Sequence, residues 1–227
     1  IDLDCDNSGH GRKYVKRNGF DKPWIWTIIN NFGGREGMFG RMDIVAKEPF
    51  KALEHPQYSK NLQGIGGIME AIGNNYVIYD LLFELNWRNS PPDLDKWIAN
   101  YVTRRYGERN SKLIEAFKIL KNTVYNKNIS PPQEGTTQSI FCGRPTLQLD
   151  EMFNLGGIEL YYEPEKLLRA WKLYIEEANK YKDIETFNYD LVTLTRQVLA
   201  NYARVLHSGI KSSYKSGNKR NFKNYEN

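Results

Sequence analysis

The pattern of hydrophobic and polar positions changes character near residue 90. Before that point, short apolar runs typical of strands alternate with stretches of helical periodicity. The apolar runs cover residues 1–5, 23–29 and 64–68, and the clearest helical stripe follows over residues 75–86. This alternation predicts βα units of an α/β protein.

The connections between these runs are less regular. We expect a polar loop over residues 7–21, a short helix over residues 37–46, and a loop with at most a helical turn over residues 49–61.

Beyond Ser90-Pro91-Pro92-Asp93 the pattern is helical, and no run there is convincing as a strand. This tetrapeptide has the features of a helix start, with Ser90 as the capping residue. Gly107 is placed to end the first helix, and Pro164 to open the third. Four apolar faces follow in turn: Leu94, Trp97, Ile98, Tyr101 and Val102; Leu113, Phe117, Leu120 and Val124; Leu168, Trp171, Ile175 and Ala178; and Leu191, Leu194, Val198, Tyr202 and Val205.

Composition allows one large domain or two small ones. The chain has 227 residues, of which 40% are hydrophobic and 26% charged, as is usual for a soluble globular protein. Aromatic residues reach 13%, and their flat faces serve both core packing and stacking against sugars. No stretch approaches the length of a membrane span.

Most of the net charge of +5 lies at the C-terminal end. Five cations occur from Lys211 onward, against Glu226 alone. Such a tail is either a solvated, frayed end or a surface for an anionic partner. It carries no nucleic-acid-binding motif, so we expect no nucleic-acid partner.

Several other sequence features either exclude a particular kind of site or leave it possible. Cys5 and Cys142 permit one disulfide without requiring it, and no metal site or Ser/His/Asp constellation is visible. The sequon at Asn128 is a weak sign of the secretory route. Because the chain begins without methionine, inside an apparent strand, we expect it to be a piece of a longer protein.

Glu70 is the main candidate for chemistry. It ends the apolar run Gly64–Ile68 and precedes a helical pattern. In a (β/α)₈ barrel, a carboxylate at the C-terminal end of a strand lies at the mouth where reactions occur. A charged loop residue that caps the next helix is the alternative interpretation.

A set of motifs runs along nearly the whole chain: Pro23-Trp24-Ile25-Trp26, Asn31-Phe32-Gly33-Gly34, Gly37-Met38-Phe39-Gly40, Gly64–Glu70, Glu84–Arg88, Arg104–Gly107, Arg144–Leu147, Tyr189–Leu191 and Leu194–Gln197. In sequence and in order, these motifs resemble those of the lysosomal α-N-acetylglucosaminidase family, glycoside hydrolase family 89. The chain departs from the family pattern at a few positions. Ile65 and Met69 stand where the family has Thr and Pro, and Arg35-Glu36 stands where the animal relatives have Asn-His.

The resemblance implies the C-terminal part of a (β/α)₈ TIM barrel over residues 1–90 and the first part of an all-α domain over residues 91–227. It implies a retaining hydrolase that removes terminal α-linked N-acetylglucosamine from heparan sulfate with two glutamates. Glu70 then corresponds to the nucleophile. The acid/base glutamate of the family lies upstream of the matching region, so we expect this piece to be inactive alone.

Three further residues are candidates for substrate binding. Trp26, near the end of its strand, could contact a sugar, with core packing as the alternative. Asn30 and Asn31 could donate to sugar hydroxyls or form an Asx turn.

The resemblance implies no cofactor, no metal, no membrane association and a lysosomal location reached through the secretory route. The expected partner is heparan sulfate or another glycan that ends in N-acetylglucosamine, and a homo-oligomer is compatible with the sequence. Two alternatives stay open. One is a non-catalytic truncated product that binds anionic glycan through the basic tail, and the other is a helical scaffold with a vestigial barrel piece.

Overall fold

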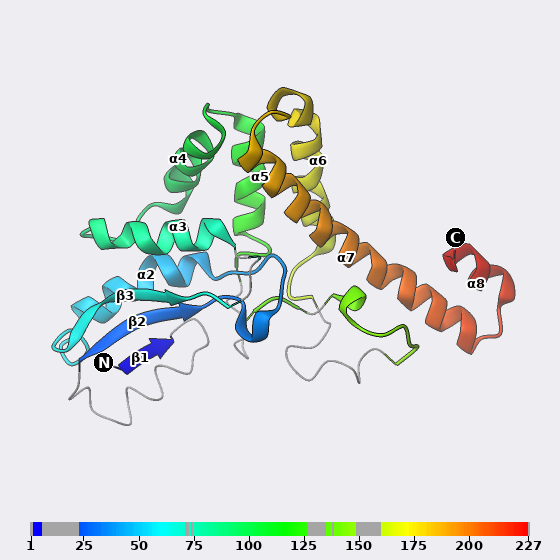
Figure 1. Ribbon diagram of the computed structural model, residues 1–227, viewed down its shortest axis with the longest axis horizontal. Coiled ribbons are helices and arrows are strands. Elements are labelled where there is room, and N and C mark those ends of the chain that lie inside the picture. The colour runs from blue at the N-terminus through cyan, green and yellow to red at the C-terminus, as the bar shows by residue number, and fades with distance from the viewer. Residues whose placement is uncertain are drawn as a thin grey trace.

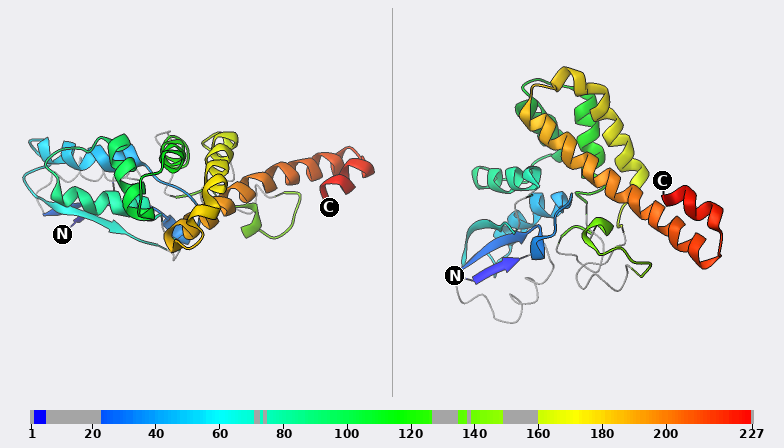
Figure 2. Two further views of the ribbon diagram at one scale, coloured as in Figure 1. Left: turned by 90° about the horizontal axis from the view of Figure 1, so that it is seen from above. Right: turned by 45° about the vertical axis from the view of Figure 1, so that its right-hand side comes forward.

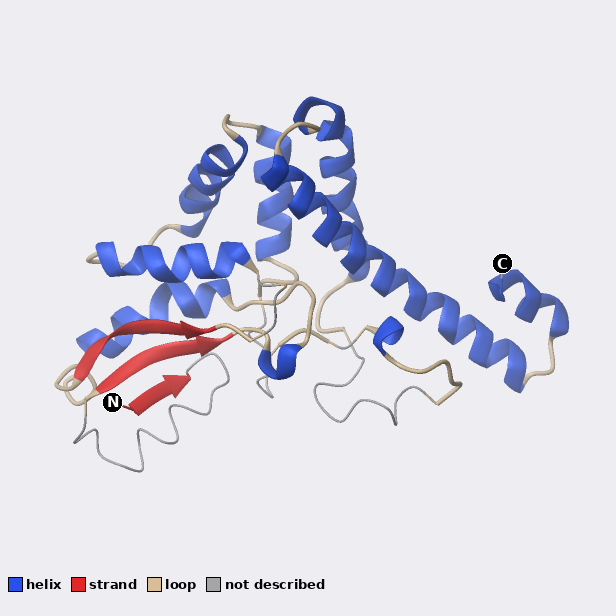
Figure 3. Cartoon of the chain, in the orientation of Figure 1, coloured by secondary structure: helices blue, strands red, loops and turns tan. Residues whose placement is uncertain are grey.

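Three parallel strands form a sheet at one end of the molecule (Figures 1 and 3). The computed structural model describes residues 2–5, 23–70, 73, 75–126, 135–137, 139–148 and 160–226. The strands are β1 (Asp2–Cys5), β2 (Trp24–Ile29) and β3 (Leu62–Ile68), adjacent in that order. Parallel neighbours need a crossover connection, and the helical segment between β2 and β3 supplies one. The predicted βα organisation is therefore confirmed.

Two helices, α2 (Met42–Glu54) and α3 (Tyr76–Glu84), cover one face of the sheet (Figures 1 and 2). Trp24, Trp26 and Ile28 alternate along β2, so they share this face, and all three belong to the buried core. Glycines let α3 approach closely. A Cβ on Gly67 of β3 would lie 3.0 Å from the Tyr79 ring, and one on Gly40 would lie 2.4 Å from Ile78 Cδ1.

The connection between β2 and β3 differs from the prediction. The expected loop over residues 49–61 is wrong in its first part, because α2 continues through Pro49 to Glu54. Proline normally ends a helix because it lacks an N–H. Here Val45, Ala46 and Phe50 are buried on the inner face of the helix, and their burial outweighs the lost hydrogen bond.

Helices make up the rest of the described chain. After the 3₁₀ turn η3 (Leu85–Trp87) come the following elements: α4 (Leu94–Tyr106), α5 (Ser111–Lys121), the 3₁₀ turn η4 (Ile140–Cys142), α6 (Pro164–Tyr181), α7 (Glu185–Lys215) and α8 (Lys219–Glu226). No described helix is both long and apolar enough to cross a lipid bilayer.

The ends of these helices test the capping predictions. Gly107 ends α4 with a φ of 87°, and Pro164 opens α6, as predicted. Ser90 is not the cap of α4. Asp93 takes that position, because its carboxylate accepts hydrogen bonds from the backbone N–H groups of Asp95 and Lys96.

The basic tail is not frayed in this structure, since it forms the end of α7 and all of α8. Cys142 is a free, exposed thiol. The Asn128 sequon and the loop expected over residues 7–21 lie outside the described residues.

A largely buried ion pair, with side chains 14% and 17% exposed, joins α4 to α7. The guanidinium of Arg105 donates two hydrogen bonds to Asp190, at 2.5 and 2.8 Å, and the Tyr106 hydroxyl donates a third at 2.7 Å. Burial alone would lower the pKa of Arg105, but the hydrogen bonds and charge of Asp190 outweigh it and raise this pKa. Tyr106 also pairs with Tyr174 of α6, so one cluster links three helices.

Replacing Asp190 by Asn should therefore destabilise the fold strongly. Arg105 would remain buried without its counter-charge, which costs roughly 3 kcal/mol. The matched control is Asp95→Asn, which removes a more exposed pair with Lys121 and should cost at most about 1 kcal/mol. Urea denaturation of the two variants measures the difference, and equal small losses would contradict the assignment.

Candidate functional site

The loop after β2 lies beside the end of β3, as expected at the carboxyl edge of a parallel sheet. This loop contains the 3₁₀ turn η2 (Phe32–Gly34). The backbone N–H of Gly33 donates a hydrogen bond to Glu70 Oε2 at 2.6 Å. The carboxylate predicted to be catalytic is thus partly buried, at the end of a strand, and held by a backbone donor.

Glycine is required in this turn. Gly33 and Gly34 have φ values of 72° and 70°, in the left-handed region that side chains with a Cβ rarely adopt. This conformation lets the Gly33 N–H face Glu70 while Gly34 N–H closes the turn on the Asn31 carbonyl at 3.0 Å. The Phe-Gly-Gly motif therefore has a direct backbone explanation.

Asn75, just before α3, ties the loop together. Its Oδ1 accepts from Phe39 N–H at 3.2 Å, and its Nδ2 donates to the Gly37 carbonyl at 3.0 Å and to Asn31 Oδ1 at 3.4 Å. The side chain is only 5% exposed, so these bonds form in a desolvated environment and are costly to lose.

Asn30 and Asn31 belong to the same network and are fully buried. Asn30 Nδ2 donates to the Phe39 carbonyl at 3.1 Å, and Asn31 Nδ2 donates to the Arg35 carbonyl at 2.8 Å. Trp26 is 1% exposed and lies in the core. Sugar contact by these three residues stays a prediction. The hydrogen bonds of Asn30 and Asn31 support a role in holding the loop.

Tyr79 of α3 lies beneath the strand end. Burial raises its pKa to about 12; a hydrogen bond from the Asn30 backbone opposes the rise, and the charge of Glu70 adds to it. The hydroxyl donates to the Ile68 carbonyl at 3.4 Å. A tyrosine with this pKa stays protonated and neutral at physiological pH, so it adds no negative charge near Glu70.

A cleft of about 550 Å³ separates this loop from α7. The loop contributes Gly33 to Gly37, and α7 contributes a wall that includes Arg196 and Gln197. Gln197 Oε1 accepts from Met38 N–H at 3.0 Å, and Arg196 pairs with Glu36 at 2.9 Å. The helical part of the chain therefore forms one wall of a cleft whose other wall includes Gly33; Glu70 is bonded to Gly33 but does not itself line the cleft.

The sequence did not nominate Glu36, Arg196 or Gln197 as site residues. Their motifs were visible, but they lie about 160 positions apart, and only the packing of α7 brings them together. A usable signal was the departure from the family at Arg35-Glu36, which falls on the cleft wall.

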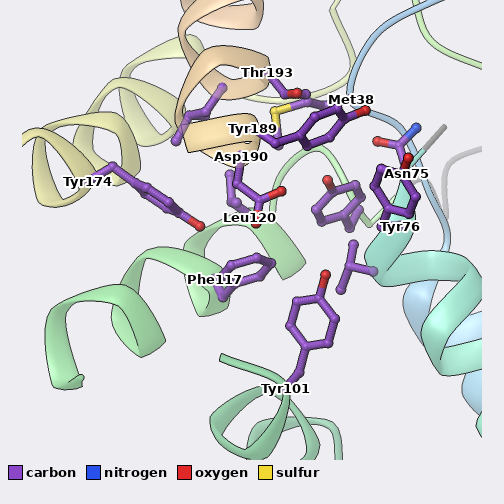
Figure 4. A pocket seen from close by; sticks show the side chains of 13 residues that line it. Met38, Asn75, Tyr76, Tyr101, Phe117, Leu120, Tyr174, Tyr189, Asp190 and Thr193 are labelled. Atoms are coloured by element: carbon purple, nitrogen blue, oxygen red, sulfur yellow. The ribbon is translucent and has the colours of Figure 1, made fainter. Parts of the chain in front are cut away.

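A small cavity of about 30 Å³ lies behind the cleft (Figure 4). Asn75 and Tyr76 approach it from one side, and Tyr101, Tyr174 and Asp190 from the helical domain. Its size suits about one water molecule. It marks the junction where α3 meets the cluster around Asp190. Among the residues that the structure describes, no cluster of His, Cys, Asp or Glu could hold a metal ion.

Parallel βα units with a carboxylate after a strand, joined to a helical domain across a cleft, define an α/β protein with a helical extension. Two family models match the chain. The alpha-N-acetylglucosaminidase (NAGLU) tim-barrel domain covers residues 1–89, and the C-terminal domain of the same family covers residues 97–227. The chain belongs to the alpha-N-acetylglucosaminidase family, which also confirms the predicted fold class.

Individual relatives agree. Human alpha-N-acetylglucosaminidase is 32% identical over 196 residues, which are 86% of this chain and 25% of the human protein. A family 89 glycoside hydrolase from Clostridium perfringens, in complex with PUGNAc, superposes with a TM-score of 0.88 at 31% identity, over 98% of this chain and 25% of that protein.

A second structure of a Clostridium perfringens protein contains two glutamate-to-glutamine changes and its substrate GlcNAc-alpha-1,4-galactose. It matches with a TM-score of 0.87 at 30% identity, over 97% of this chain and 24% of that protein. The chain thus spans about a quarter of the length of these relatives.

Replacing Asn75 by Asp should disrupt the loop that holds Glu70. A carboxylate oxygen would face the Gly37 carbonyl and Asn31 Oδ1 where an amide now donates, at a cost of about 3 kcal/mol. Urea denaturation measures the loss of stability, and faster hydrogen exchange of the Gly33 amide shows that the loop has loosened. The control Asn86→Asp is exposed and should change stability little. A wild-type exchange rate at Gly33 would contradict the role.

Proposed function

We propose that this chain carries the nucleophile, Glu70, of a retaining α-N-acetylglucosaminidase. The observation that carries the proposal is the position of Glu70 after β3, hydrogen-bonded to the Gly33 N–H beside a cleft, in a member of this family. The substrate is a glycan that ends in α-linked N-acetylglucosamine. Terminal N-acetylglucosamine in the substrate of the Clostridium perfringens relative supports this class.

The proposed reaction needs two carboxyl groups about 5 Å apart. A Glu70 oxygen attacks the anomeric carbon as the glycosidic C–O bond breaks, and the leaving oxygen takes a proton from the second carboxylic acid. The second group then removes a proton from water, which attacks the same carbon and releases Glu70. The Gly33 N–H stabilises the ionised carboxylate before attack and again as it leaves.

We propose that the proton donor lies outside residues 1–227. The relative bound to its substrate carries two glutamate-to-glutamine changes, which supports a mechanism with two carboxylates. We also propose heparan sulfate as the natural substrate, a lysosomal location, and a division into residues 1–90 and 91–227.

The chain by itself should hydrolyse an aryl α-N-acetylglucosaminide far more slowly than the Clostridium perfringens enzyme. Loss of a general acid typically costs about 10²–10⁴ in rate. Initial rates at equal protein concentration test this. Turnover by residues 1–227 at the rate of the complete enzyme would show that a proton donor is present within the chain.

A chimera tests Glu70 itself. In it, residues 1–227 replace the matching quarter of the Clostridium perfringens enzyme. An activated fluorosugar should leave a covalent adduct on Glu70, detectable by peptide mass spectrometry, and Glu70→Gln should abolish both adduct and turnover. Glu54→Gln, on the exposed end of α2, is the matched control and should leave both intact.

The outcomes separate the alternatives. Turnover without an adduct would indicate assistance by the 2-acetamido group of the substrate instead of a Glu70 nucleophile. If the Glu70→Gln chimera kept full turnover, Glu70 would not be the nucleophile. Residues 1–90 would then be a vestigial barrel piece beside a helical scaffold.

A further inference from the structure

The peptide between Gly37 and Met38 is held from two sides. Asn75, which precedes α3, donates from Nδ2 to the Gly37 carbonyl at 3.0 Å. Gln197 of α7 accepts from the Met38 N–H through Oε1, also at 3.0 Å. Because the carbonyl and the N–H of a planar trans peptide point in opposite directions, the two side chains approach it from opposite sides. The strand-containing part of the chain and the helical domain therefore hold the same peptide.

The side chain of Gln197 is itself fixed. It is buried, and its Nε2 donates to the Tyr162 hydroxyl at 3.0 Å and to Asn201 Oδ1 at 3.3 Å. The Met38 N–H can only donate, so the amide oxygen of Gln197 must face the loop. With both ends of the amide bonded, Gln197 has one favourable orientation and gives the loop a rigid acceptor.

Gly37 shows how closely the loop approaches α7. Its φ is 146°, and a Cβ on it would lie 3.1 Å from Gln197 Oε1 and 2.6 Å from Thr136 Oγ1. A residue with a side chain would push the loop away from Gln197. Glycine at this position is therefore a condition for the contact between the loop and α7.

Arg196, the residue before Gln197, makes a second contact with the loop. It pairs with Glu36, whose side chain lies against Gly73, where a Cβ would be 3.5 Å from Glu36 Cδ. The paired side chains are 60% and 47% exposed, and exposed pairs contribute little to stability. A buried N–H without an acceptor is much more costly. Of the two contacts, the bond from Met38 to Gln197 is therefore the stronger constraint.

The same loop supplies the donor to Glu70. Gly33 lies four residues before Gly37 in the sequence, and its N–H donates to Glu70 Oε2 at 2.6 Å. The side chain of Asn31 bonds to the Arg35 carbonyl at 2.8 Å and accepts from Asn75 at 3.4 Å. The turn that contains Gly33 is thus tied to the held peptide, and a shift of that peptide would move the donor of Glu70.

From these contacts we propose that Gln197 is a positioning residue for the glycosidase reaction. It acts from the helical domain, through the Met38 N–H and the turn at Gly33, and keeps Glu70 in the orientation from which it attacks the anomeric carbon. This inference rests on the proposed function and deepens it, because it makes α7 part of the structure that orients the nucleophile.

Steady-state kinetics of the chimera with the Clostridium perfringens enzyme test the proposal on an aryl α-N-acetylglucosaminide. Gln197→Met keeps the length of the side chain and removes the acceptor of the Met38 N–H. The value of kcat should fall about tenfold or more, since a misplacement of about 1 Å can cost on the order of 100-fold in rate. KM should change by less than about twofold, because binding of the ground state is retained. Hydrogen exchange of the Gly33 amide, measured on residues 1–227, should become faster.

Two further variants separate positioning from a general loss of stability. Gln197→Glu should restore much of kcat, because a carboxyl oxygen still accepts from the Met38 N–H. Thr195→Val is the matched control, two residues earlier on α7. It removes the acceptor of Trp171 Nε1, which donates at 2.9 Å, and so weakens the packing of α7 on α6 without a contact to the loop. It should leave kcat and exchange at Gly33 near their wild-type values.

Four results would overturn the positioning role. These are an unchanged kcat in Gln197→Met, a loss no larger than that in Thr195→Val, equal losses in Gln197→Met and Gln197→Glu, and wild-type exchange at Gly33. Far-ultraviolet circular dichroism checks that each variant is folded. Gln197→Asn, which withdraws the acceptor by one methylene, decides the question if Gln197→Met unfolds.

The Glu70→Gln chimera separates this inference from the proposed function. If Glu70→Gln abolishes turnover while Gln197→Met and Gln197→Asn keep it, the positioning role fails and the proposed function stands. If Glu70→Gln keeps full turnover, the proposed function fails, and the positioning role fails with it.

Discussion

The ion pair between Arg105 and Asp190 is the interaction on which the arrangement of the helical domain depends. It is bidentate, largely buried and supported by Tyr106, so it fixes both the position and the rotation of α7 relative to α4. About two turns further along α7 are Arg196 and Gln197, and they reach the loop after β2. A contact within the helical domain thereby shapes the wall of a cleft beside the barrel strands.

The site itself is made mainly from backbone groups and amides. Two glycines in the left-handed region turn an N–H toward Glu70, and Asn75 holds the loop with three hydrogen bonds. Between the two backbone groups that Asn75 holds, Met38 N–H donates to Gln197, whose amide in turn donates to Asn201. The loop after β2 and helix α7 are thus joined by one polar network.

Local pattern predicted much of the fold. Strand β2 and helices α4 and α5 bury the apolar faces that periodicity predicts. The face predicted for α6 is wrong, because that helix buries Leu167, Ala170 and Tyr174 and leaves Leu168 and Ile175 exposed. In α7 the predicted face is wrong at its end, where Tyr202 and Val205 are exposed. The pattern failed where tertiary contacts outweigh local preference. Burial of Phe50 carries α2 through Pro49, and Tyr225 packing on Gly209 orders a basic tail that looked frayed.

The sequence by itself determined the kinds of elements, the family resemblance and the identity of the strand-end carboxylate, because these depend on residue type and short-range order. It also indicated that glycines follow β2, but not which atom their N–H groups would face. Only the tertiary structure decided that Gly33 holds Glu70, that Trp26 packs in the core, and that Glu36 meets Arg196 across a cleft. Those contacts join residues separated by 37 to 160 positions, and their formation depends on how helices pack, which no local pattern encodes.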